Sequence, residues 1–321
     1  MPGKIVLVGE PMGLFIAREE GELGEVSSFN AAVAGAEFNV AVGLTRLGHE
    51  VAYCTKLGYD PMADRILAAM EKNNISTDLI LRTTDAITGF MMKGKTSEGD
   101  PKIAYFRKGS AASTINTHDI DKLDLCDCDY LHVTGIFPAI SPSTLAATKR
   151  LIRRAKDLDM TVSFDPNLRP QLWESQEKMV KTLNELASYA DTVLPGIGEG
   201  KILTGSDNEV EIANFYHEMG ARNVIVKLGG KGAYYSQRNE ETYDKSGYVD
   251  AFPVKEIVDT VGAGDGFAAG VVSAIAEHLG IKEATERGNV IGAKQITHPS
   301  DNEGLPTREE LEALIAAGEI G

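Results

Sequence analysis

The chain has few cysteines and no long apolar run, and both absences limit what it can be. Its three cysteines, Cys54, Cys126 and Cys128, have neither the number nor the spacing of a disulfide framework or a zinc site. We therefore expect reduced thiols in a cytoplasmic protein. The six histidines show no ligand or triad spacing. Because no apolar stretch can cross a membrane and the start is too brief for a secretory signal, we expect no membrane association.

A basic stripe is also absent. The sequence has 47 Asp and Glu against 32 Lys and Arg, a net charge of −15. Such a chain repels nucleic acid and acidic membranes, so we expect neither as a partner. An anionic substrate has to be bound by local arginines against the overall field. The remaining composition, 43% hydrophobic and 25% charged, is ordinary for a soluble enzyme.

Apolar strands and helices alternate along most of the chain. The expected strands are 4–9, 51–58, 130–135, 161–165, 192–194 and 223–228, and the expected helices are 38–47, 61–70, 142–158, 174–189, 263–279, 282–297 and 307–317. This order predicts an α/β fold, a doubly wound and mostly parallel sheet in one domain spanning 1–321. Two regions, at about 12–34 and 88–108, lack a helical period. We expect them to pair as a small β-sheet lid over the active site; two surface hairpins are the alternative.

The most specific segment is the glycine-rich run 259–270, DTVGAGDGFAAG. A loop there becomes an apolar helix, whose free N–H groups and dipole favour an anion. Gly262, Ala263 and Gly264 are small enough for phosphate to approach the backbone. The carboxylate of Asp265 is costly beside phosphate unless it takes a proton from an attacking hydroxyl. The run therefore fits phosphoryl transfer to an alcohol; a glycine-rich helix start with Asp265 as an ordinary early-turn acid is the alternative.

The same run resembles the signature of the ribokinase-like (pfkB-type) carbohydrate kinases. The resemblance implies a ribokinase-like fold and an ATP-dependent sugar kinase that uses Mg²⁺; a requirement for a monovalent cation stays open. It implies that Asp265 is the general base and that the N–H groups of Gly262, Ala263 and Gly264 stabilise the transferring phosphoryl group. Because the lids of related enzymes often pair across dimers, we also expect a homo-oligomer.

Three further segments resemble the sugar-binding side of this family. Gly35 and Asn39 stand in a G-x-x-x-N-x-A segment that contacts sugar hydroxyls in the family; a plain helix start is the alternative. Arg169 ends the run D-P-N-L-R after an expected strand, where ligands of open sheets bind and a guanidinium suits carboxylate or phosphate. Asp301 resembles a late acidic contact to substrate hydroxyls, or is a surface turn acid.

Features near the expected lid narrow the resemblance to 2-keto-3-deoxygluconate kinases. Tyr105 and Arg107 alternate onto one strand face in a Y-x-R-x-x-S-A segment, so that both can point at one ligand, and the resemblance assigns the substrate's carboxylate to Arg107. Met91, in the other lid strand, joins this substrate set. Leu14 stands where fructokinases and ribokinases commonly have aspartate, a replacement that suits an acidic, deoxygenated sugar; a core leucine is the alternative.

The nucleotide side is expected elsewhere along the sheet. Lys227, Gly229 and Gly232 form a K-x-G-x-x-G segment that resembles the family's ATP contact, although alone it is a turn between strands. Asn167 and Asn289 match further positions on the nucleotide side. The chain has no G-x-x-x-x-G-K-[ST] motif, which excludes a P-loop enzyme.

One segment departs from the family pattern. Where related kinases have N-x-x-E, which helps to place magnesium through water, this chain keeps Glu199 but has Gly196 in place of the asparagine. Glu199 is thus an indirect metal candidate, or only the acid of a helix start. Taken together, the resemblance implies phosphorylation of the terminal (6-) hydroxyl of 2-keto-3-deoxygluconate, with the galactonate epimer left open. A fructokinase or ribokinase is the second interpretation, and a non-catalytic sugar-binding regulator the third.

Overall fold

The computed structural model describes residues 3–96, 101–238, 244–299 and 301–320. Most of its strands form one large sheet. In spatial order these are β14 (Lys245–Val249), β13 (Ala233–Gln237), β12 (Asn223–Lys227), β11 (Thr192–Val193), β10 (Thr161–Asp165), β9 (Cys128–Thr134), β1 (Lys4–Val8), β4 (Val51–Leu57) and β5 (Ile75–Ser76), with β6 (Ile80–Arg82) beside β4. From β12 to β5 the neighbouring strands are parallel, which confirms the expected architecture.

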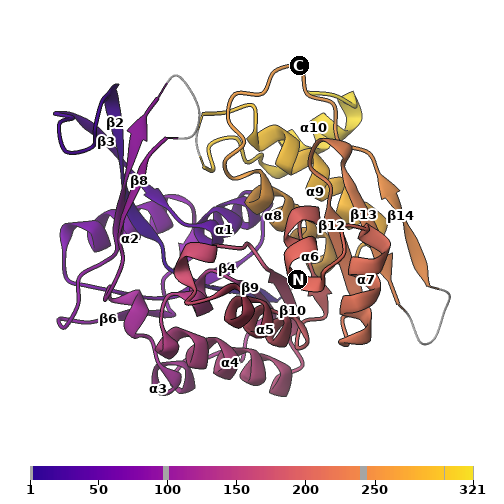
Figure 1. Cartoon of the computed structure of the whole chain (residues 1–321), viewed down its shortest axis with the longest axis horizontal. Helices are drawn as coiled ribbons and strands as arrows, with labels where there is room; N and C mark the ends of the chain where they lie inside the picture. Colours follow the sequence, from indigo (N-terminus) through magenta and orange to yellow (C-terminus); the bar gives the residue numbers. More distant parts are fainter. Residues whose placement is uncertain (1–2, 97–100, 239–243, 300, 321) are drawn as a thin grey trace.

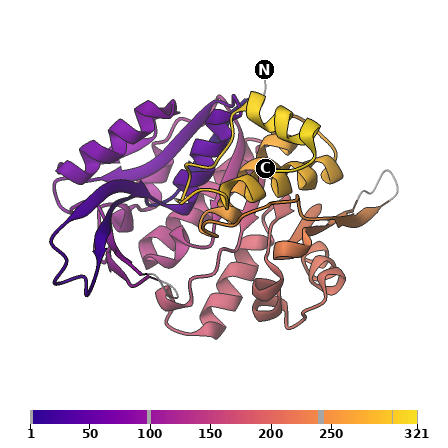
Figure 2. The same cartoon turned by 90° about the horizontal axis from the view of Figure 1, so that it is seen from above.

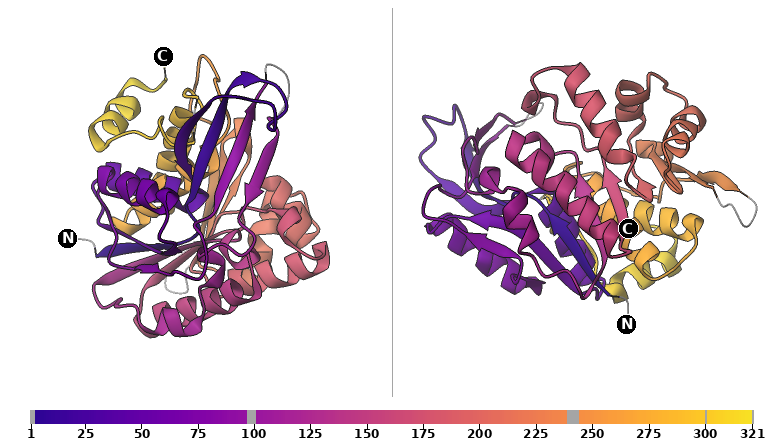
Figure 3. Two further views of the ribbon diagram at one scale, coloured as in Figure 1. Left: turned by 90° about the vertical axis from the view of Figure 1, so that its left-hand side faces the viewer. Right: turned by 90° about the horizontal axis from the view of Figure 1, so that it is seen from below.

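Helices cover both faces of this sheet. They are α1 (Ala36–Arg46), α2 (Pro61–Lys72), α3 (Thr117–Asp121), α4 (Pro142–Asp157), α5 (Gln176–Ala187), α6 (Ile197–Thr204), α7 (Glu209–Glu218), α8 (Ala263–Ala276), α9 (Ile281–Gln295) and α10 (Arg308–Ala317). Figure 3 (left) shows α4, in magenta, on one side of the strands and α10, in yellow, on the other. Each face of the sheet has its own hydrophobic core, because successive side chains of a strand point to opposite faces. In β1, Val6 and Val8 pack with the layer of α3–α5 and α7, whereas Ile5 and Leu7 pack with α1, α2 and α8–α10.

A separate small sheet stands at one end of the molecule, at the upper left of Figure 1. Its strands run in the order β3 (Phe29–Ala34), β2 (Met12–Glu20), β7 (Phe90–Lys95) and β8 (Ile103–Phe106). The two hairpins join through the parallel pair β2–β7. The expected small separate sheet is confirmed, and we call it the lid; its strands lie within the regions 12–34 and 88–108.

The opposite end was not foreseen from the sequence. There β13 and β14 form an antiparallel hairpin on the edge of the large sheet, which projects away from the lid in Figure 2. Gly232 begins it with φ +92°, and a Cβ at that position would lie 2.0 Å from the carbonyl oxygen of Val249. Only glycine fits such a turn.

Among the described residues, no helix is long and apolar enough to span a bilayer.

Candidate active site

A cavity of about 970 Å³ lies between the lid and the carboxyl ends of the central strands. The lid contributes Met91, Lys93, Tyr105 and Arg107, and the main domain contributes Gly35, Glu37, Asn39, Asp165, Asn167, Arg169, Glu199, Lys227, Gly262, Gly264, Asp265 and Asp301. Most of the residues singled out from the sequence are thus brought to one place. The position agrees with the rule that ligands of open α/β sheets bind beyond the carboxyl ends of strands.

The glycine-rich run forms the first turn of α8 at the cavity floor. Gly262 is the residue before the helix and has φ +79°. A Cβ on Gly262 would lie 2.2 Å from the carbonyl oxygen of Asp301, so this position requires glycine. Gly264 has open space around it, with the Lys227 ammonium nitrogen 4.0 Å from where a Cβ would stand. The helix start therefore offers N–H groups, low bulk and a nearby cation to an anion.

Asp265, in this first turn, is held by two amides. Asn39 Nδ2 donates to its Oδ2 at 2.8 Å, and Asn167 Nδ2 lies at the hydrogen-bond limit from Oδ1, at 3.5 Å. Asn302 Nδ2 donates to Asn39 Oδ1 at 2.9 Å, which fixes the orientation of the Asn39 amide. Both ends of the Asn39 side chain thus have one partner within the protein, and the amide keeps a second N–H and a second lone pair for the expected sugar contact.

The electrostatics around Asp265 favour a proton acceptor. Burial raises the pKa of Asp265 to about 7, and the charges of Asp165 and Glu37 act in the same direction. The hydrogen bond from Asn39 and the charge of Arg169 oppose this shift. A carboxyl group with a pKa near neutrality is well matched to general-base catalysis at physiological pH.

Two buried acids of the cavity wall were not selected from the sequence. Asp165, 2% exposed at the end of β10, forms an ion pair with Lys227 at 2.7 Å between Oδ2 and Nζ. Glu37, 1% exposed in α1, accepts a hydrogen bond from Thr134, and burial raises its pKa. Asp165 belongs to the quoted D-P-N-L-R run, so a strand-end acid was available as a signal; nothing local distinguishes Glu37.

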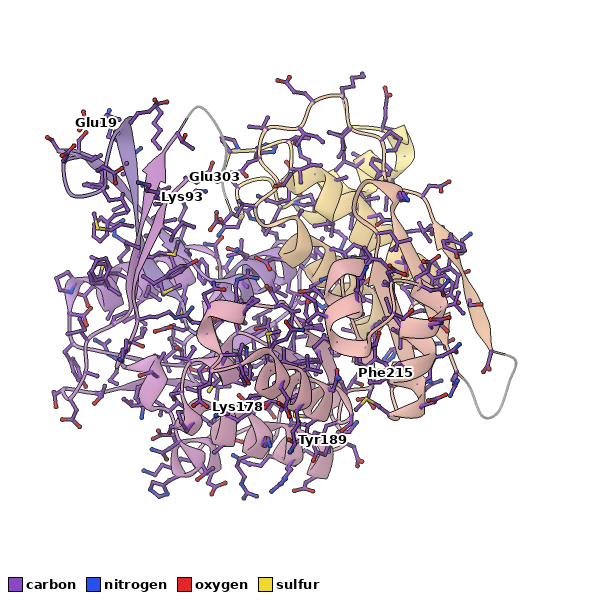
Figure 4. All side chains as sticks on the ribbon, viewed as in Figure 1. Glu19, Lys93, Lys178, Tyr189, Phe215 and Glu303 are labelled. Carbon is purple, nitrogen blue, oxygen red and sulfur yellow. The ribbon has the colours of Figure 1, made fainter. Side chains whose placement is uncertain are left out.

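The lid end of the cavity is cationic. Arg107, just after β8, donates from Nε to Oε2 of the buried Glu10 at 2.7 Å. Tyr105 and Met91 are directly paired across β7 and β8 and line the same cavity. Lys93, labelled in Figure 4, lies two positions further along β7 and reaches to 3.9 Å from Asp259. Neither Lys93 nor Glu10 was selected from the sequence, because a lysine on a strand carries no distinctive signal and the partner of Glu10 lies 97 positions away.

Arg169 and Asp301 complete the cavity from the main domain. Arg169 Nη1 donates to the carbonyl oxygen of Leu168 at 2.9 Å, and its charge acts on Asp265 and Glu37. Burial raises the pKa of Asp301, against the charge of Lys93, which lowers it. Both side chains line the cavity, and their contacts to substrate stay predictions.

Some expected nucleotide residues lie outside the cavity lining. Gly229 and Gly232 belong to the turn between β12 and β13. Asn289, on α9, donates its side-chain N–H groups to the carbonyl oxygens of Val249 and Asp250, at 3.2 and 3.0 Å. These three residues stay predictions for an adjoining nucleotide groove.

The metal expectation for Glu199 gains no support from its contacts. Its Oε1 accepts the N–H of Leu168 and its Oε2 the N–H of Gly196, at 2.8 and 2.7 Å, as in a capping box at the start of α6. No group of three or more His, Cys, Asp or Glu able to hold a metal ion occurs in the described part of the chain. Gly196 has φ −76° and ψ 155°, which an asparagine could also adopt.

The interpretation of Leu14 as a pocket residue is not supported. Leu14 is 4% exposed and packs with Met12, Ala34 and Met91 in the small core of the lid. Unlike Met12 and Met91, it is not part of the cavity lining. Leu14 is thus a core residue of the lid, which was the alternative interpretation from its apolar character.

Comparison with known proteins identifies the family of the chain. The family described as "pfkB family carbohydrate kinase" matches residues 3–308. The chain is 44% identical to a 2-dehydro-3-deoxygluconokinase of Bacillus subtilis, over 97% of this chain and 95% of the relative. It is 29% identical to a probable fructokinase-4 of Arabidopsis thaliana, over 97% and 96%. A crystal structure of a PfkB protein from Polaromonas sp. JS666 superposes with a TM-score of 0.88 at 44% identity, covering 97% of this chain and 99% of that one. The chain belongs to the pfkB family of carbohydrate kinases.

Proposed function

We propose that this chain is the ATP-dependent kinase of 2-keto-3-deoxygluconate, also called 2-dehydro-3-deoxygluconate, and that it phosphorylates the terminal (6-) hydroxyl. The observation that carries the proposal is the 44% identity, along nearly the whole chain, to an enzyme of that name. The cavity supports it independently, because cations at the lid end and a carboxylate at the floor suit a substrate that is an acid at one end and an alcohol at the other.

In this proposal the sugar acid spans the cavity. Its carboxylate binds the guanidinium of Arg107, with Tyr105 and Met91 alongside, and Asp301 accepts hydrogen bonds from its hydroxyl groups. Its terminal hydroxyl lies at Asp265. Binding at both ends fixes the acceptor oxygen in line with the incoming phosphoryl group, which lowers the entropic part of the barrier.

Asp265 then removes the proton from that hydroxyl as the oxygen forms its bond to the γ-phosphorus of ATP and the bond to the bridging oxygen of ADP breaks. The proton ends on a carboxylate oxygen of Asp265. The N–H groups of Gly262, Ala263 and Gly264 stabilise the negative charge on the transferring phosphoryl oxygens. Lys227, whose ammonium group is already beside this loop, and Arg169 add positive charge from the main domain.

ATP would extend from this loop toward Gly229, Gly232 and Asn289, with Asn167 near its phosphates. Mg²⁺ would be held chiefly by the phosphate oxygens of the nucleotide, since the described residues supply no metal cluster of their own. When bound, the ion neutralises charge on those oxygens. Closure of the lid over the sugar would exclude water and so limit futile hydrolysis of ATP.

Steady-state ADP release with Mg-ATP tests the proposal. We expect 2-keto-3-deoxygluconate to be preferred over fructose and ribose by a factor of about 100 or more in kcat/KM. Turnover of fructose alone would support the second candidate, a fructokinase, which the 29% identity to a probable fructokinase favours. Binding of a sugar without any turnover would indicate a regulator, to which the glycine at position 196 is the one pointer.

We also propose that the protein is a cytoplasmic homo-oligomer that pairs through its lids. Phe106 of the edge strand β8 is 47% exposed on the face opposite the cavity, an apolar side chain that a second copy would cover. Light scattering after size-exclusion chromatography should give at least twice the mass of one chain. A mass of one chain at micromolar concentration would contradict this assembly.

A further inference from the structure

A buried carboxylate in the cavity wall, that of Glu10, contacts the lid arginine. Glu10 lies in the connection between β1 and β2, and its side chain is 1% exposed. Oε2 accepts the N–H of Arg107 Nε at 2.7 Å, and Oε1 accepts the hydroxyl of Ser110. Arg107 directly follows β8, and Ser110 lies three positions later. One carboxylate thus ties the last strand of the lid to the main domain.

This contact leaves part of the guanidinium available to a ligand. Arg107 Nη2 is buried and lies 2.7 Å from the same Glu10 oxygen as an ion pair, so the Nε–Nη2 edge of the guanidinium is turned toward Glu10. The Arg107 side chain is 11% exposed and lines the cavity. Because a guanidinium is a rigid plane, an anchor on its Nε side fixes the direction of the remaining N–H groups.

The local sequence leaves room for this carboxylate. Gly89 directly precedes β7, and a Cβ there would lie 2.5 Å from Glu10 Oε1. Any other residue at this position would displace Glu10. The carboxylate also compensates the charge of Arg107 in the absence of substrate, when a poorly solvated cation would otherwise be costly. The contact therefore has both a geometric and an electrostatic consequence for the lid end of the cavity.

We propose that Glu10 is a positioning residue for recognition of the sugar acid. It holds the Arg107 guanidinium by its Nε edge, so that the outer N–H groups face the substrate's carboxylate. A fork held in this way favours a planar, charged carboxylate over a neutral group, and Glu10 thereby contributes to the preference for sugar acids. This inference rests on the proposed function, in which Arg107 binds that carboxylate.

A double-mutant cycle on KM tests it, with wild type, Glu10→Ala, Arg107→Ala and the double variant. The substrates are 2-keto-3-deoxygluconate and its neutral carboxamide. We expect Glu10→Ala to raise KM for the acid about tenfold while kcat stays within about threefold. KM for the carboxamide should hardly change. In the Arg107→Ala background the added Glu10→Ala should change KM less than about twofold, because Glu10 acts through Arg107.

Glu10→Gln and Glu22→Ala complete the design. Gln keeps an acceptor for Nε, so we expect a smaller rise in KM for the acid, about threefold, and this variant carries the same cycle if Glu10→Ala does not fold. Glu22 forms an exposed lid ion pair with Lys102, at 65% and 71% side-chain exposure, and its removal should leave KM unchanged.

The results that would contradict the role of Glu10 differ from the result that would contradict the proposed function. An equal rise in KM for acid and carboxamide, or the same rise with and without Arg107, would overturn the role of Glu10 and leave it a structural residue. Unshifted KM values in Glu10→Ala and Glu10→Gln would do the same. Failure of the wild type to phosphorylate the sugar acid would instead contradict the proposed function.

Discussion

The two ends of the cavity are built on different supports. Asp265 stands on α8, whose buried residues belong to a large core shared with α1, α9 and the central strands. Arg107 follows β8 of the lid, whose own buried core consists of Met12, Leu14, Ala34 and Met91. The lid also leaves three large apolar side chains of β8 more than 40% exposed. We therefore expect the chemical step at the well-packed end, which carries Asp265 and which we call the rigid end. We expect substrate recognition at the lid end, which carries Arg107 and has fewer packing contacts.

Substitution at the rigid end should have the largest effect. Asp265→Asn keeps the shape of the side chain but removes the proton acceptor, so we expect kcat to fall about 10³-fold or more. KM for the sugar acid should change less than about threefold, since the recognition end is intact. ADP release measures both constants, and stabilisation of the variant by sugar acid in a thermal melt controls for binding. A variant with a tenth or more of the wild-type kcat would contradict the role of Asp265.

Substitution at the lid end should have the complementary effect. Arg107→Ala removes the cation that pairs with the substrate's carboxylate, and we expect KM for the acid to rise about 100-fold with kcat within about tenfold. Arg107→Lys should recover little, because an ammonium group cannot replace a planar fork held by Glu10. If kcat fell and KM stayed constant, the separation between the two ends would be wrong.

The pH dependence sharpens the comparison further. Since burial raises the pKa of Asp265 to about 7 and only the ionised form accepts a proton, kcat/KM should rise about tenfold from pH 6 to a plateau above about pH 8. In the folded protein Asp265 ionises at a higher pH than in the unfolded chain. Its contribution to the free energy of unfolding is therefore fully present at low pH, where the group is protonated in both states, and is lost as pH rises through 7. Asp265→Asn should therefore melt higher than wild type at pH 8 but not near pH 4. Activity that is flat or falls over this range would contradict the assignment.

The smallest catalytic effect is expected for a substitution of Glu277, at the end of α8 that lies away from the cavity. Glu277, at the far end of α8, accepts hydrogen bonds from Arg287 and Arg308, and these contacts lower its pKa to about 2. Because the pKa of Glu277 is lower in the folded protein than its ordinary value of 4.5, its ionised carboxylate stabilises the fold above about pH 4.5. This stabilisation is lost as pH falls toward 2. Glu277→Gln should lower Tm by several degrees at pH 7, and by less at pH 3.5. Both kcat and KM should stay within about twofold; a large change in KM would show that the two ends are coupled.

Local chemistry explains what could be predicted from the sequence. The turn at Gly262 and the acid at Asp265 lie within four positions, and helix-start chemistry depends only on such near neighbours. The alternation of strands and helices likewise fixed the layers of the fold, and the absence of helical period marked the lid. Arg107 and Arg169 were recognisable because each stands in a segment of several matching residues.

Long-range pairing explains what could not be predicted from the sequence. Glu10 is 97 positions from Arg107, and Asp165 is 62 positions from Lys227, so no local pattern reveals either ion pair. Leu14 points into the core of the lid rather than the cavity, a choice between two neighbouring spaces that the sequence does not encode. The β13–β14 hairpin was missed although β13, with two tyrosines after a glycine turn, carries a strand signal; the K-x-G-x-x-G segment before it was interpreted only as a nucleotide contact or a turn.

Competition within one reaction tests the central claim most directly. Equimolar 2-keto-3-deoxygluconate and fructose would be incubated with the protein and limiting Mg-ATP, and the phosphorylated products separated by mass spectrometry. We predict that the 6-phosphate of the sugar acid makes up nearly all of the product. Phosphorylated fructose as the main product would contradict the proposed substrate and the recognition role of the lid.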